Sequence, residues 1–184
     1  MSDPVGEYSL DEAISVGRDL DRLGFHWFEE PFRDFEPAKY AELCRSLDIP
    51  IAATKTTRGG PWGVAQAIRF GAADIVRADV SWKAGITGTL KIAHLAEANG
   101  MRGEIHCTTM GLMDIANLHV SCAIRNCQFF ELLVPEEPFR FPMATPYPIS
   151  SDGTIRVPEK PGLGVELDWP TMDAQCVAHR MKEV

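Results

Sequence analysis

Apolar and polar positions along the chain follow two patterns that alternate, one typical of a helix and the other of a strand. Residues 9–24 place apolar side chains at helical spacing, with Ser9 and Glu12 as a capping box and Gly24 as a stop, and an apolar run over 25–29 follows. Four more predicted helices, each before a predicted strand, repeat this order: 37–48 before 49–54, 61–71 before 74–79, 85–100 before 102–106, and 111–124 before 128–133. Strict alternation with short loops predicts right-handed βαβ units on a parallel sheet.

The residues at the ends of these strands are ionisable. If Asp3 ends a short first strand, the strand-end residues are 24 to 27 apart: Asp3, Glu29, Lys55, Asp79, His106 and Glu131. In a parallel barrel all such ends open on one face, where barrels build their active sites. An open doubly wound sheet makes a ring of six charged ends less expected. We therefore predict an α/β fold, a partial TIM-type (β/α) barrel of about six βα units, with a catalytic mouth. The alternative is that the residues belong to loops and their spacing reflects unit length.

The pattern changes after Glu131. Residues 134–169 carry seven of the 13 prolines and turn signals such as Asp152-Gly153. This composition predicts an extended, wrapping segment with a small hairpin around 149–157. A helix is predicted over 170–184. We thus divide the chain into a partial barrel with its wrapping segment, 1–169, and a C-terminal helix, 170–184.

Composition adds limits to the class of protein. The 184 residues suffice for one domain, and 45% hydrophobic and 24% charged residues are ordinary for a globular protein. A net charge of −8 argues against nucleic acid or an anionic membrane as the main partner. Five cysteines without a C-x-x-C pair, and an N-terminus without the pattern of a signal peptide, predict a cytoplasmic protein.

Several motifs, in order, resemble a known superfamily. They are "WFEEP" at 27–31, "ADVSWKAGITG" at 78–88, the strand end "EIH" at 104–106, "FFEL" at 129–132 and "DGTIRVPEKPGLGVELD" at 152–168. Together they resemble the mandelate racemase and muconate lactonizing enzyme branch of the enolase superfamily, which includes acid-sugar dehydratases. The resemblance implies a magnesium ion, held by three strand-end carboxylates, that stabilises the enediolate formed when a proton leaves the carbon next to a carboxylate.

The resemblance also implies roles for single residues. Asp3 and Glu29 match the first two metal ligands, while Glu30 is expected to turn to a structural partner such as a backbone N–H or a basic side chain. Asp79 and His106 match the Asp–His dyad that transfers the proton.

Two further matches concern the substrate. Glu131 matches the catalytic acid that hydrogen-bonds the substrate carboxylate or enolate. Lys83 matches a lysine in the loop after the dyad aspartate, near the mouth, where it would contact the substrate or serve a structural role.

The chain departs from the pattern in two ways. Lys55 stands where the third carboxylate ligand should be, and an ammonium group has no lone pair to offer a metal. We expect it to form a salt-bridged cluster with Asp3 and Glu29, or to contact substrate, and to weaken or abolish magnesium binding. The family's capping domain and two further barrel strands have no counterpart in the sequence. We therefore expect either a fragment of a longer protein or a truncated product that forms a homo-oligomer to cover its sheet edges.

The leading hypothesis for function is a mandelate-racemase-like enzyme portion. Its chemistry would be magnesium-assisted abstraction of the proton next to a carboxylate, with dehydration or racemisation of a sugar acid, impaired by Lys55 and by the missing portion. One alternative is a lyase that forms a Schiff base on Lys55. Another is a non-catalytic remnant that oligomerises.

Overall fold

The computed structural model describes residues 1–33, 36–107, 111–134, 141–144, 147 and 149–178. Helices and strands alternate through most of this part: α1 Leu10–Arg22, β1 Phe28–Glu29, α2 Pro37–Ser46, β2 Ile51–Ala53, α3 Gly60–Phe70, β3 Ile75–Ala78, α4 Gly85–Ala98, β4 Arg102–Ile105, α5 Leu112–Ala123 and α6 Trp169–Gln175. The capping box at α1 is confirmed, because Ser9 and Glu12 bond to each other's backbone amides. The predicted α/β alternation is therefore confirmed for five helices and four strands.

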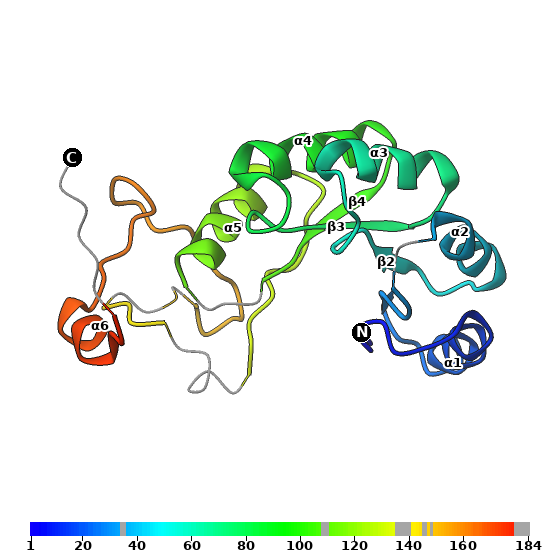
Figure 1. The fold of residues 1–184 in the computed structure, drawn as a ribbon, viewed down its shortest axis with the longest axis horizontal. Helices are drawn as coiled ribbons and strands as arrows, with labels where there is room; N and C mark the ends of the chain where they lie inside the picture. Colours follow the sequence, from blue (N-terminus) through cyan, green and yellow to red (C-terminus); the bar gives the residue numbers. More distant parts are fainter. Residues whose placement is uncertain (34–35, 108–110, 135–140, 145–146, 148, 179–184) are drawn as a thin grey trace.

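The four strands form one parallel sheet in the order β1-β2-β3-β4. Phe28 pairs with Ile51, Ala52 with Ile75, and Val76 with Gly103. Figure 1 shows α1 to α5 beside this row of strands, with α6 set apart from it at the far left. Each strand thus lies beside its neighbour in sequence, which is the order that a parallel barrel requires.

The expected first and sixth strands differ from the prediction. The first is reduced to a parallel bridge between Ser2 and Phe28. Residues 128–133 do not form a strand, because the amides of Gln128 and Phe129 donate to the buried carboxylate of Glu104 rather than to carbonyls of β4. The count of six βα units is therefore not confirmed.

The core lies between the sheet and the helices. Phe28, Ile51, Val76 and Ala78 point to that side, and pack with buried residues of α1 to α5. Because side chains alternate across a strand, their neighbours Glu29, Arg77 and Asp79 point to the opposite, inner side. The outer face of the sheet therefore holds the apolar core, and the inner face carries charged groups.

The C-terminal segment carries little regular structure. Bridges join Met143 to Leu167 and Ile149 to Ile155, the second at the centre of the predicted hairpin. The predicted helix over 170–184 is too long, because α6 ends at Gln175 and Cys176 is extended. No residue of α6 is buried, so packing does not support a longer helix. Residues 179–184 lie outside the described part.

No helix in the described part of the chain combines the length and apolar character needed to cross a membrane.

Candidate active site

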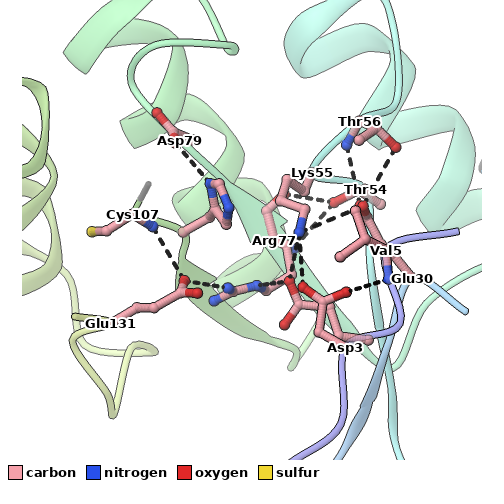
Figure 2. A network of polar contacts seen from close by, with 12 residues as sticks. Asp3, Val5, Glu30, Thr54, Lys55, Thr56, Arg77, Asp79, Cys107 and Glu131 are labelled. Carbon is pink, nitrogen blue, oxygen red and sulfur yellow. Dashed lines mark hydrogen bonds and ion pairs between the residues drawn. The ribbon is translucent and has the colours of Figure 1, made fainter. Parts of the chain in front are cut away.

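The predicted strand-end residues meet on the inner side of the sheet. Figure 2 shows the side chains of Asp3, Lys55, Asp79 and Glu131 gathered in one region. Glu29 contacts Lys55 there, and His106 contacts Asp79. One group is a histidine–aspartate pair, and the other is a chain of ion pairs: Asp3, Lys55, Glu29, Arg77 and Glu131. The structure therefore brings together all six residues that sequence spacing selected.

Asp79 and His106 form a buried hydrogen-bonded pair. His106 Nδ1 lies 2.8 Å from Asp79 Oδ2, and the second Asp79 oxygen accepts the Ser81 amide at 2.6 Å. Burial by itself would raise the pKa of Asp79, but the hydrogen bonds from His106 and Ser81 outweigh it and hold that pKa below its ordinary value. Asp79 is therefore ionised, so Nδ1 of His106 is the donor and Nε2 is left to exchange a proton.

A helix residue fixes the two strands that carry this pair. The Asn117 side chain, wholly buried on α5, accepts the Val80 amide at 3.0 Å and donates to the His106 carbonyl at 3.0 Å. The ends of β3 and β4 are thus held to one amide group. Sequence reasoning missed Asn117, although a buried polar residue in an apolar helix is a signal that it bonds to backbone.

The loop after β3 depends on a close backbone approach. A Cβ on Gly88 would lie 1.8 Å from the Lys83 carbonyl oxygen, so only glycine fits there without a shift. The Lys83 side chain is buried and donates to the Thr57 carbonyl. This contact is typical of a structural residue, and the substrate contact expected of Lys83 stays a prediction.

The two adjacent glutamates at the end of β1 have different partners. Glu30, held at a positive φ of 35°, accepts the Thr56 amide at 3.1 Å, which confirms the expected structural partner. Glu29 faces the interior, where its Oε1 accepts from Lys55 at 3.2 Å and its Oε2 from the Trp27 indole at 3.2 Å.

Lys55 forms the predicted salt-bridged cluster with Asp3 and Glu29, and Glu30 is a third carboxylate beside it. Its Nζ is 3.1 Å from Asp3 Oδ2, 3.2 Å from Glu29 Oε1 and 3.8 Å from Glu30 Oε2. Burial would lower the pKa of Lys55, but the negative charges of these neighbours outweigh burial and raise it. The amine is therefore firmly protonated.

Arg77 is the functional candidate that sequence reasoning missed. Its Nε donates to Glu29 at 2.8 Å and its Nη2 to Glu131 at 2.7 Å. Glu131 also accepts the Cys107 amide at 3.2 Å, so it is held by two donors. The signal was present, because Arg77 precedes Asp79 by two residues in one strand and must share its face.

The donor set at this centre can be compared with what a magnesium ion needs. Two of the three implied carboxylates, Asp3 and Glu29, are present, and both accept hydrogen bonds from Lys55. Among the residues that the structure describes, no group of three or more His, Cys, Asp or Glu side chains is placed to hold a metal. The residues therefore do not fit a magnesium ion as they stand.

The fold and the site define a class: an α/β protein whose parallel strands converge on a histidine–aspartate pair and buried acids. Within that class, the chain belongs to the enolase C-terminal domain-like family, whose model matches residues 1–171.

Individual relatives agree with this family. The chain is 34% identical over 162 residues to an arabinonate dehydratase of Saccharolobus solfataricus, covering 87% of the chain and 42% of the relative. It is 30% identical to a D-galactarolactone cycloisomerase of Agrobacterium fabrum, covering 91% and 46%. It also resembles the structure of D-glucarate dehydratase from Agrobacterium tumefaciens complexed with magnesium, with a TM-score of 0.81, 38% identity and coverage of 91% and 44%. The chain thus spans less than half the length of each of these relatives.

Proposed function

We propose that the chain is the barrel portion of a mandelate-racemase-like enzyme that removes the proton next to the carboxylate of a sugar acid. The observation that carries this proposal is the contact of 2.8 Å between His106 Nδ1 and Asp79 Oδ2. An ionised aspartate fixes the imidazole tautomer and strengthens Nε2 as a base. The relatives that act on arabinonate and glucarate support a sugar acid as the substrate class.

The proposed reaction is a dehydration. His106 takes the proton from the carbon next to the carboxylate, and the electron pair of that C–H bond forms a double bond to the next carbon. The hydroxyl on that next carbon leaves with its bonding pair and receives the proton back from His106, so that water is released. One imidazole thus serves as base and then as acid. Return of the proton to the other face, without loss of water, would be racemisation.

We also propose that magnesium binding is lost or badly weakened, because Lys55 takes the position of a carboxylate ligand. The developing negative charge would then lack a divalent cation such as the magnesium in the D-glucarate dehydratase structure. We therefore expect slow catalysis by this chain.

The proposal is tested by exchange of the proton next to the carboxylate. Arabinonate and glucarate would be incubated with the protein in deuterated water and followed by proton NMR. We expect slow loss of that proton signal, abolished in His106→Asn. If the proton signal fades equally with the unaltered protein and with His106→Asn, or if it persists with each of them, the proposal is contradicted. The second result would favour a non-catalytic remnant.

A Schiff-base mechanism on Lys55 is not favoured. A nucleophilic lysine needs a lowered pKa, whereas the charges around Lys55 raise its pKa. Borohydride trapping of a carbonyl substrate on Lys55 would nevertheless reveal such a reaction.

Association with a second copy is a further part of the proposal. In a parallel barrel each edge strand pairs with another strand. A strand edge without such a partner presents unpaired backbone groups, with which a second copy of the chain can pair. Light scattering would reveal a defined oligomer.

A further inference from the structure

Arg77 connects Glu29 and Glu131, two carboxylates to which the family resemblance assigns other partners: a metal ion for Glu29 and the substrate for Glu131. The side chain is 3% exposed and donates to Glu29 Oε1, Glu131 Oε2 and the Ile105 carbonyl, the last at 3.3 Å. Its guanidinium is planar and presents its donors in fixed directions. Arg77 therefore fixes Glu29 and Glu131 relative to each other; Figure 2 shows Arg77 beside Glu131.

Both oxygens of Glu29 are taken by fixed donors. Lys55 and Arg77 donate to the same oxygen, Oε1, at 3.2 and 2.8 Å, while Trp27 donates to Oε2 at 3.2 Å. A metal bound at Glu29 Oε1 would have to displace at least one of the two donors on that oxygen. Removal of Lys55 alone would leave the shorter of the two contacts on Oε1 intact.

Thr54 links the strand ends that carry Lys55 and Arg77. Thr54, the residue before Lys55, has a φ of 86°, a conformation that is strained for a β-branched residue. Its hydroxyl donates to the Arg77 carbonyl at 2.8 Å and accepts the Arg77 amide at 3.2 Å. The end of β2 is thus held to β3 at the residues that carry Lys55 and Arg77.

We propose that Arg77 is a second, independent barrier to a divalent ion, and that Lys55 and Arg77 together replace the charge of that ion. These two permanent single charges neutralise the strand-end acids and hold them in place. Reversal of Lys55 to a carboxylate then does not restore a metal site by itself. This inference rests on the proposed assignment of Asp3 and Glu29 to ligand positions.

The experiment compares magnesium binding in three variants by isothermal titration calorimetry. Lys55→Glu restores the third carboxylate, and Lys55→Glu with Arg77→Gln also removes the guanidinium. The matched control combines Lys55→Glu with Arg102→Gln, which removes an arginine of the neighbouring strand that pairs with Glu104.

We expect the Lys55/Arg77 double variant to bind magnesium at least about tenfold more tightly than Lys55→Glu or the control. Equal affinity of Lys55→Glu and the Lys55/Arg77 variant would overturn the inference, and so would absence of binding in a folded Lys55/Arg77 variant.

A second measurement uses the unaltered protein, because the double variant could fail to fold. A ligand that binds the native state raises its melting temperature. We expect the same melting temperature with a chelator and with about 10 mM magnesium chloride. A higher value with magnesium would overturn the inference. Neither measurement uses a substrate or His106, so their failure is distinguishable from failure of the proposed proton transfer.

Discussion

Replacement of Lys55 by methionine tests whether the ion-pair chain stabilises the fold. Methionine keeps most of the apolar stem and removes the charge. Glu29 and Glu30, whose side chains are 4% and 5% exposed, would lose an ammonium that now lies 3.2 and 3.8 Å away. Removing one partner of a buried ion pair costs about 3–5 kcal/mol. We expect about 3 kcal/mol, at the lower end of that range, because Arg77 still neutralises Glu29.

The assay is urea unfolding followed by circular dichroism at neutral pH, with the free energy of unfolding taken by linear extrapolation. Lys160→Met is the matched control, because Lys160 pairs with Glu166 on the surface, where both side chains are about two-thirds exposed. We expect little measurable change there. If Lys55→Met lowers the free energy of unfolding no more than Lys160→Met, the ion-pair chain does not stabilise the folded state and the reasoning fails.

The pH dependence of that difference follows from the raised pKa of Lys55. A group with a raised folded pKa contributes stability that is complete below its ordinary value of 10.5 and is lost as pH rises through the folded pKa. The difference between the two proteins should therefore be constant across neutral pH. It should narrow only as pH rises through the raised folded pKa of Lys55.

Three further substitutions probe other parts of the site. Asp79→Asn should slow proton exchange by about 10²- to 10⁴-fold. The same substitution should also lower the free energy of unfolding at neutral pH. This loss should disappear as pH falls below 3.8 and through the lowered folded pKa of Asp79. Urea unfolding curves at neutral pH and below pH 3.8 check this. Gly88→Ala should destabilise the protein by about 1–3 kcal/mol, because its Cβ meets the Lys83 carbonyl, whereas exposed Thr87→Ala should not; thermal unfolding compares them. Glu104→Gln should reduce hydrogen-exchange protection of the amides of residues 128 and 129, and unchanged protection would refute the role given to Glu104.

The parts of the fold that sequence predicted well are those with strong local signals. The capping box located the start of α1, and the even spacing of strand ends located one polar side chain after another on a common face. The failure at 128–133 has a different origin. Apolar residues there indicate a strand, but the competing acceptor, the Glu104 carboxylate, comes from another strand. Such competition depends on tertiary contacts, which a local pattern does not contain.

The sequence predicted which residues form the candidate site better than it predicted the contacts between them. The spacing of strand ends selected Lys55, and the family resemblance showed that a carboxylate is expected at that position. The hydrogen-bond donors around Glu29, however, depend on the three-dimensional structure. The spacing pattern selects only strand-end residues, and Arg77 lies two residues before the strand-end residue Asp79, so the pattern does not include it. Reading each strand at a period of two would have placed Arg77 on the face that carries Asp79.

Net charge alone does not exclude a divalent ion from this centre. Four carboxylates and two cations sum to two negative charges, to which a cation would still be attracted: Asp3, Glu29, Glu30 and Glu131 with Lys55 and Arg77. The obstacle is that the carboxylate oxygens already accept from buried cations. An incoming ion on Glu29 Oε1 would disrupt the ion pair of Glu29 with Lys55 or Arg77, and breaking a buried ion pair costs several kcal/mol. Two carboxylates give a metal too few ligands to offset that cost. In our proposal, therefore, local hydrogen bonding rather than net charge keeps a divalent ion out of this centre.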